Sequence, residues 1–253
     1  MGKIIAVTNQ KGGDGKTTTS VNLTASLAVT KHKVLLIDID PQGNATMGCG
    51  VEKDEIEITT CDILLNESIA EKVIISLDEL GFDLMPANSD LTAAEVALIQ
   101  SDTKERRLAD ALIPHVEDYD FIIIDCPPSL NTLTLNALVA ADSVLIPMQC
   151  EYYSLEGLSA LMDTLKQIRQ TVNRKLELEG LLRTMFDSRS RLTREVSAQL
   201  VDHFEKQVFR TCIPRNVRLA EAPSHGLPII KYDKSSTGAK AYLALASEMS
   251  RRR

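Results

Sequence analysis

A glycine-rich segment near the N-terminus limits the folds open to this chain more than any other feature. Residues 9–18 read Asn-Gln-Lys-Gly-Gly-Asp-Gly-Lys-Thr-Thr and follow the apolar run Ile4–Val7. A helix is expected after them, from about Thr17 to Thr30. In a strand–loop–helix unit, glycines let backbone amides curl around phosphate oxygens, and the helix turns its positive end toward them. The segment therefore predicts a phosphate-binding loop.

The side chains of this loop match the roles that phosphate binding requires. Its flexible backbone positions are Gly12, Gly13 and Gly15. Lys16 is expected to reach the terminal phosphates, and the Thr17 hydroxyl is a candidate Mg²⁺ ligand. The usual pattern has glycine where this chain has Gln10, so the motif is a variant. Taken without its neighbours, the segment is also compatible with an ordinary glycine-rich turn.

Other short apolar runs predict a sheet that helices cover on both faces. The runs are rich in Val, Ile and Leu and do not alternate with polar residues, as in buried parallel strands. They are Val34–Ile39, Phe121–Ile124, Val144–Met148 and Gly180–Met185, and a further strand is expected over Val208–Ile213. Helices are expected over Leu91–Val116, Leu130–Ala140, Ser154–Val172, Thr193–Lys206 and Ser236–Arg251. This alternation predicts an α/β fold with a doubly wound, mainly parallel sheet. Because no Pro/Gly/Ser-rich linker interrupts residues 1–253, we expect one domain.

Acidic residues follow two of the expected strands. Asp38 and Asp40 lie in the stretch Asp-Ile-Asp-Pro-Gln-Gly-Asn-Ala-Thr, and Asp125 follows four apolar residues. Ligands bind at the carboxyl ends of the strands in such sheets, so these carboxylates are well placed for Mg²⁺ or an attacking water. A strand-end acid before a Pro/Gly turn is the plain structural alternative. The nearby phosphate loop favours the functional interpretation.

Lys11 and its neighbours resemble a known family. The stretch K-G-G-x-G-K-T-T resembles the deviant Walker A motif of the ParA/MinD class of P-loop ATPases. In that class the first lysine crosses a dimer interface to the partner's nucleotide, so Lys11 is expected to act like an in-trans arginine finger. The position of Asp14 usually carries a small or apolar residue in the family. We expect a carboxylate there to weaken nucleotide binding or turnover, unless it points away from the phosphates.

The resemblance also implies roles at the other strand ends. Asp40 lies in a stretch that looks like switch I, so it is expected to position the attacking water and to contribute to the metal site. Asp125 looks like the Walker B carboxylate that holds Mg²⁺ together with Thr17. Thr18 completes the phosphate-binding residues that begin at Lys11. The family's turn P-R-N lies against the adenine, which makes the following residues candidate base contacts: Met185, Pro214 and Asn216.

Charge is unevenly distributed along the chain. The net charge is −7, yet residues 183–253 contain 14 basic and 7 acidic residues, whereas residues 1–182 contain 14 basic and 28 acidic residues. This asymmetry indicates an interaction surface, although a solvated basic face has the same pattern. The basic segment resembles the short chromosomal ParA/Soj proteins, in which arginines matching Arg189 and Arg218 bind DNA. The chain has no aromatic-rich groove, so we expect non-specific, salt-sensitive binding to double-stranded DNA.

The resemblance extends from Lys3 to about Met249 and implies a cytoplasmic, nucleoid-associated ATPase that uses ATP/ADP and Mg²⁺. ATP is expected to close a homodimer that binds DNA and drives chromosome or plasmid segregation. A ParB-type centromere-binding protein is expected to stimulate hydrolysis, which opens the dimer and releases the DNA.

Three alternatives remain open. The first is a MinD-like membrane-associated ATPase, which needs a C-terminal amphipathic helix with a basic face and a bulky apolar face, whereas the C-terminal apolar residues here are expected to pack internally. The second is a cluster-containing reductase or an ATP-dependent ligase on the same scaffold. The reductase needs paired cluster cysteines, and the five cysteines form no evident matched set. Their lack of a C-x-x-C pair argues against a disulfide framework or zinc site and favours a reducing cytosol. The third is a nucleotide-dependent DNA-binding regulator with little turnover.

Overall fold

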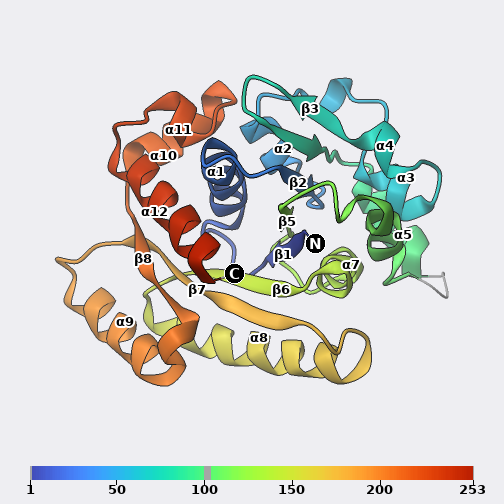
Figure 1. Ribbon diagram of the computed structural model, residues 1–253. Coiled ribbons are helices and arrows are strands. Elements are labelled where there is room, and N and C mark those ends of the chain that lie inside the picture. Colours follow the sequence, from blue (N-terminus) through green and yellow to red (C-terminus); the bar gives the residue numbers. More distant parts are fainter. Residues whose placement is uncertain (1, 100–103, 253) are drawn as a thin grey trace.

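The computed structural model describes residues 2–99 and 104–252 (Figure 1). One sheet contains eight strands in the order β3-β4-β2-β5-β1-β6-β7-β8. Their bounds are β1 Lys3–Val7, β2 Val34–Asp38, β3 Ile75–Leu77, β4 Phe82–Met85, β5 Phe121–Asp125, β6 Ser143–Gln149, β7 Glu177–Phe186 and β8 Val208–Pro214. Every neighbouring pair is parallel except β3 and β4. The predicted α/β fold with a doubly wound, mainly parallel sheet is confirmed.

Helices lie on both faces of this sheet (Figure 1). The longer ones are α1 Lys16–Val29, α5 Leu91–Ile99, α7 Thr132–Ala140, α8 Tyr152–Thr171, α9 Arg191–Phe204 and α12 Thr237–Arg252. The shorter ones are α2 Asn44–Gly48, α3 Thr60–Leu65, α4 Ala70–Val73, α6 Arg107–Leu112, α10 Val217–Glu221 and α11 Ile229–Tyr232. Four 3-10 turns complete the described helical elements: η1 Lys53–Glu55, η2 Ile113–His115, η3 Glu205–Gln207 and η4 Ala222–His225.

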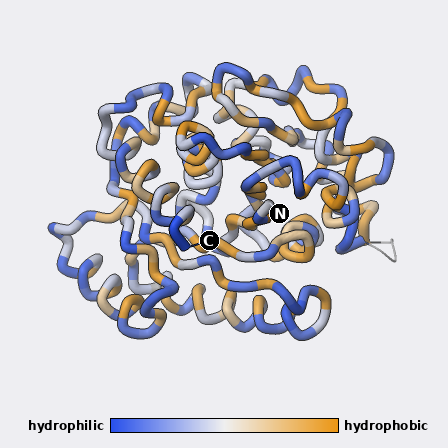
Figure 2. The backbone as a smooth tube through the Cα atoms, viewed as in Figure 1, coloured by the Kyte–Doolittle hydropathy of each residue, from blue (hydrophilic) through white to orange (hydrophobic). Residues whose placement is uncertain are grey.

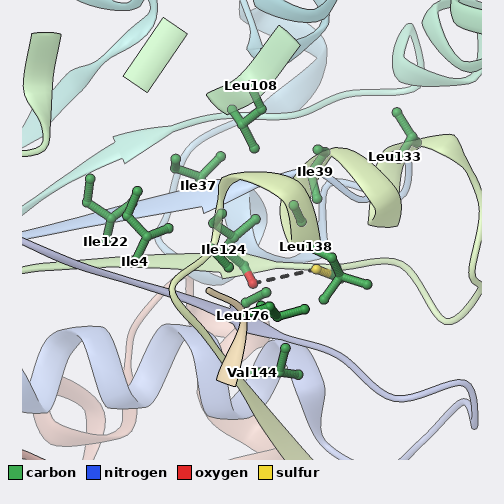
Figure 3. Packing of buried hydrophobic residues seen from close by; sticks show 14 of the residues in the cluster. Ile4, Ile37, Ile39, Leu108, Ile122, Ile124, Leu133, Leu138, Val144 and Leu176 are labelled. Atoms are coloured by element: carbon green, nitrogen blue, oxygen red, sulfur yellow. Dashed lines mark hydrogen bonds between the residues drawn. The ribbon is translucent and has the colours of Figure 1, made fainter. Parts of the chain in front are cut away.

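Two clusters of buried hydrophobic side chains cover the two faces of the sheet. Successive residues of β1 point to opposite faces, so Ile4 contributes to one cluster and Ile5 to the other. Figure 3 shows part of the first cluster, which includes Ile4, Ile37 and Ile124. In Figure 2 the hydrophobic segments gather toward the middle of the molecule, and much of the outer chain is hydrophilic. This double burial explains why the central strands read as continuous apolar runs.

The expected single helix over Leu91–Val116 is wrong. Helix α5 ends at Ile99, residues 104–106 form a turn, and α6 ends before the 3-10 turn that contains Pro114. Residues 100–103 of the expected helix lie outside the described residues. The apolar content of the segment was misleading because Val96 and Ile99 are about 60% exposed and do not form a core-facing stripe. Strands β3 and β4 were not expected, since they are only three and four residues long.

Candidate nucleotide site

The sheet brings the expected phosphate loop and the acidic residues to one edge. Val7, the last residue of β1, pairs with Asp125 at the end of β5, and Asp38 at the end of β2 pairs with the same Asp125. The loop of residues 8–15 leaves β1 at this edge and leads directly into α1 at Lys16. Three parallel strands therefore place the loop, two carboxylates and the start of a helix side by side.

Side chains from the ends of β6 and β7 fix the backbone of the loop. The Gln149 side chain donates a hydrogen bond to the carbonyl of Gly13 at 3.1 Å. The Thr184 hydroxyl donates to the carbonyl of Asp14 at 2.9 Å. Lys16 Nζ donates across the loop to the carbonyl of Lys11 at 3.0 Å. The loop is thus closed around the Lys16 ammonium.

The Lys16 ammonium is held in a largely buried position, with 7% of the residue exposed. Burial lowers the pKa of Lys16, whereas Asp125 and Asp14 oppose that change. A carbonyl oxygen is a weak partner for an ammonium compared with an anionic oxygen. The Lys16 ammonium can therefore exchange this carbonyl for an anionic oxygen at an electrostatic gain.

Asp14 is turned into the protein rather than toward the solvent. The residue is fully buried, and its Oδ2 accepts a hydrogen bond from Asn9 Nδ2 at 2.6 Å. Asn9 Nδ2 also donates to the carbonyl of Pro147 at 2.9 Å, so the carboxyl group faces the junction of β1 and β6. Asp14 Oδ1 has no hydrogen-bond partner among the described residues. Burial raises the pKa of Asp14, and the nearby Lys11 and Lys16 ammonium groups lower it.

Asp38 and Asp125 form a fully buried acidic pair. Asp38 accepts hydrogen bonds from the backbone and hydroxyl of Thr46, both at 2.8 Å. Asp125 accepts from the hydroxyls of Thr17 at 2.8 Å and Ser20 at 2.7 Å. Burial, together with neighbouring acidic residues, raises the pKa of Asp38 to about 6 and that of Asp125 to about 8. A cation placed beside the two carboxylates would therefore stabilise their charged forms.

These oxygens fit a hard divalent cation. Within residues 2–99 and 104–252, no group of three or more acidic, His or Cys side chains is arranged to hold a metal ion by itself. The Thr17 hydroxyl and the Asp125 carboxylate are oxygen ligands of the kind Mg²⁺ uses together with phosphate oxygens and waters. Asp40 lies near them and is 6% exposed, and its Oδ1 accepts a hydrogen bond from the Gln42 amide at 2.9 Å.

Lys11 does not reach into its own loop. Its Nζ lies 2.6 Å from Glu151 Oε2 at the start of α8, and the two side chains are 42% and 52% exposed. The hydrogen bond that Lys11 donates to Glu151 raises the pKa of Lys11. Because exposed ion pairs contribute little to stability, this contact is easily exchanged for another anionic partner.

The three candidate base contacts lie at the ends of β7 and β8. Met185 follows the loop-binding Thr184 and is 41% exposed, with a positive φ of 46°. Pro214 pairs with Phe186 on the neighbouring strand. The Asn216 side chain is already engaged, because Oδ1 caps α10 by accepting from Leu219 N, and Nδ2 donates to Thr237 Oγ1 at 2.8 Å.

The two predicted DNA-binding arginines lie at the surface of the C-terminal third. Arg189 holds Asp187 through two hydrogen bonds of 3.0 Å, and this pairing lowers the pKa of Asp187 to about 2. Arg218 Nη1 lies 2.8 Å from Glu221 Oε2. Each guanidinium therefore has a carboxylate partner.

Several residues that organise the site were missed by the sequence reasoning. They are the side chains that hydrogen-bond to the loop or to the buried acids: Asn9, Ser20, Thr46, Gln149 and Thr184. Each is an ordinary polar residue near a strand end or on the first turns of a helix. Their position at the carboxyl edge of a predicted parallel sheet was the one available signal.

Comparisons with known proteins agree with this architecture. A family model described as an AAA domain matches residues 2–178. The sporulation initiation inhibitor protein Soj of Bacillus subtilis is 53% identical over 249 residues, which cover 98% of each chain. The chromosome partitioning protein ParA of Myxococcus xanthus is 52% identical over 252 residues, which cover 100% of this chain and 89% of that protein.

A solved structure matches equally completely. Cobyrinic acid a,c-diamide synthase from Mycobacterium smegmatis, with bound ADP and magnesium, has a TM-score of 0.88 and 36% identity, covering 100% of this chain and 95% of that one. Fold, loop and buried acids thus define a P-loop ATPase. Within that class, the chain belongs to the ParA/Soj family of chromosome-partitioning ATPases. The resemblance noted in the sequence is confirmed. Among the described residues, none of the helices combines the length and apolar character needed to cross a membrane.

Proposed function

We propose that residues 1–253 act as one P-loop ATPase domain that binds DNA in response to ATP. In this proposal ATP and Mg²⁺ close a homodimer, the dimer binds double-stranded DNA non-specifically, and hydrolysis resets it. Its role is chromosome or plasmid segregation on the nucleoid, with a ParB-type protein as the partner that stimulates hydrolysis. The observation that carries the proposal is the meeting of Lys16, Thr17, Asp40 and Asp125 at one sheet edge in a chain of the ParA/Soj family.

The nucleotide phosphates are assigned to the loop. Backbone amides of Gly12, Gly13 and Gly15 surround the phosphate oxygens, and the Lys16 ammonium exchanges the Lys11 carbonyl for them. Thr17 and Asp125 hold the Mg²⁺, which when bound neutralises charge on the phosphates. Thr18 and Asp14 contribute backbone to the same loop. Met185, Pro214 and Asn216 are assigned to the adenine.

Asp40 is assigned to the hydrolytic water. Its carboxylate is anchored by the Gln42 amide, so it can orient a water and take up a proton at a carboxylate oxygen. Lys11 is assigned to the nucleotide of the second copy. It leaves Glu151, an exposed partner, and places its ammonium beside the charge that develops on the transferred phosphoryl group.

DNA binding is assigned to the basic segment of residues 183–253. Arg189 and Arg218 are 89% and 55% exposed at the side chain, so both can meet a phosphate backbone. Two copies of the segment in a dimer double the contacts and raise the avidity, whereas one net-acidic copy binds weakly.

A second candidate is favoured by Asp14, which places a carboxyl group inside the phosphate loop. In this candidate the protein binds nucleotide and DNA but turns ATP over slowly. A MinD-like membrane role receives less support, because the apolar residues of α12 are used internally: Tyr242, Leu245 and Met249 are at most 1% exposed. An amide-forming role, as in the diamide synthase, is distinguished by assaying for an organic acceptor.

The deciding experiment is DNA binding with ADP or ATP across a salt series. The proposal expects tight, salt-sensitive binding with ATP and weak binding with ADP. Equal binding in the two nucleotides contradicts the switch. Steady-state ATPase measured with DNA and a ParB-type peptide separates the two candidates, because absence of turnover in every condition favours the regulator.

A further inference from the structure

Two glycines from distant parts of the chain touch backbone to backbone. Gly50 follows α2, Gly226 follows η4, and their φ angles are 79° and 62°. A Cβ atom on Gly50 would lie 2.9 Å from the Gly226 carbonyl oxygen, and one on Gly226 would lie 2.6 Å from Gly50 Cα. The positive φ angles and the close approach both require glycine. No side chain lies between the two segments at this point.

On one side, this contact is tied to the buried acids through a short, hydrogen-bonded segment. The Asp40 carbonyl accepts from the Gly43 amide at 2.9 Å, and Asp38 holds Thr46 at the middle of α2. The Gly50 amide then donates to the Met47 carbonyl at 3.0 Å. These hydrogen bonds fix most of the backbone between Asp40 and Gly50. A displacement of the backbone at Asp40 is therefore transmitted along α2 to Gly50.

On the other side, the contact is connected by hydrogen bonds to residues 217–227, which we call the Arg218 segment. The Gly226 amide donates to the Pro223 carbonyl at 3.0 Å, and the Ser224 hydroxyl donates to the Glu221 carbonyl at 2.7 Å. Glu221 is the ion-pair partner of Arg218, and η4 continues α10 without a break. The position of Gly226 thus constrains the position of Arg218.

Beside this contact, α2 and η4 border a cavity of about 560 Å³. Its lining includes Thr17 and Thr18 at the start of α1, Met47 of α2, and Ser224 of η4. The cavity extends from the residues assigned to Mg²⁺ and phosphate to the Arg218 segment. The two segments are in backbone contact at the glycines and border the cavity beside that contact. A shift of one segment is therefore passed to the other through the glycine pair.

We propose that Gly50 and Gly226 are positioning residues that couple residues 40–50, the Asp40 segment, to the Arg218 segment. Rearrangement of residues 40–50 around ATP shifts Gly50, and Gly50 moves η4 and α10 because the backbones are in contact. The inference rests on the proposed function, since it concerns how ATP strengthens DNA binding. Coupling between two sites is reciprocal, so DNA must strengthen ATP binding by the same factor.

The test compares Gly50→Ala and Gly226→Ala with a matched control, Gly81→Ala. Gly81 has the same kind of backbone, with φ of 82°, but no atom lies within 4 Å of its added Cβ. DNA affinity is measured with ADP and with a non-hydrolysable ATP analogue, and the ratio of the two affinities is the coupling factor. Wild type and Gly81→Ala should share one factor, in the usual range of about 5- to 150-fold. In the two test variants it should fall toward one, while nucleotide affinity without DNA stays at the control value.

The outcomes separate the inference from the proposed function. A wild-type factor of one contradicts the proposed function itself. A normal wild-type factor that Gly50→Ala and Gly226→Ala retain in full overturns the coupling role. Should both variants fail to fold, hydrogen exchange on the wild-type protein decides the matter. The analogue should then alter amide protection in residues 44–51 and also in residues 217–227, and a response absent from the second range overturns the inference.

Discussion

At the carboxyl edge of the sheet, Asp38 and Asp125 are fully buried, whereas Arg189 in the basic segment has 89% of its side chain exposed. The buried acids are held by hydroxyl and amide donors in fixed positions. At the surface, Arg189 pairs with Asp187, and Arg218 pairs with Glu221 and Asp233. The fixed positions of buried groups should therefore determine function at the sheet edge. In the basic segment, competition between carboxylates and other anions for the arginines should determine it. Substitutions should have large, specific effects at the sheet edge and graded, salt-dependent effects in the basic segment.

The largest effect is expected for Lys16→Ala. The change removes the buried ammonium assigned to the phosphates, so nucleotide binding should be lost and DNA binding should no longer respond to ATP. Equilibrium binding of a fluorescent ATP analogue measures this directly. Retained ATP affinity would remove Lys16 from the phosphate site, and a melting curve checks that the variant is folded.

Asp40→Ala should slow hydrolysis by about 10²- to 10⁴-fold, the usual contribution of a positioned acid–base group. ATP binding should persist, because Asp40 is not assigned to the phosphates themselves. The protein should accumulate as a DNA-bound dimer, which sedimentation with and without DNA detects. A DNA-free monomer in the presence of ATP contradicts the assignment.

Arg189→Glu combined with Arg218→Glu should abolish most DNA binding and leave ATP-dependent dimerisation intact. Each phosphate contact that is lost should lower the salt-dependence slope by about 0.9. The matched control is Arg106→Glu, which reverses the charge of an exposed arginine outside the basic segment that pairs with Asp110, and DNA affinity should stay at the wild-type value. Unchanged DNA affinity in the double variant moves the DNA-binding surface elsewhere.

The smallest effect is expected at Asp14, because this residue is buried at the sheet edge and its effect depends on its charge. Burial raises the pKa of this carboxyl, so its charge appears only as the pH rises through that raised value, and phosphate binding should then weaken. Asp14→Asn keeps the shape and cannot ionise, so its ATP affinity should lose this pH dependence, on the order of tenfold or less. Identical pH profiles for wild type and Asp14→Asn contradict the prediction.

Asp14→Val tests whether the carboxyl group itself limits ATP affinity or turnover. Relief of the buried charge should raise either the affinity or the ATPase rate. Equal values in both proteins would show that the inward orientation of Asp14 already removes its cost. In that case the second candidate, a slow regulator, loses its main support.

The strongest sequence predictions concern segments whose local pattern is decisive. The loop of residues 9–18 and the apolar strands before Asp38 and Asp125 were recognisable, because buried parallel strands and phosphate loops have few sequence solutions. The segment Leu91–Val116 failed because apolar composition alone does not reveal which face packs, and Val96 is largely exposed. The inward orientation of Asp14 was not predictable either, since it depends on Asn9 and Pro147 being brought together by β1 and β6.

The sequence by itself determined the alternation of strands and helices, the phosphate loop and the charge asymmetry between residues 1–182 and residues 183–253. These are properties of short segments or of composition. Only the tertiary structure decided which polar side chains hold the loop and that Gly50 meets Gly226. Such contacts join residues far apart in the chain, and the packing of the sheet and its helices selects them.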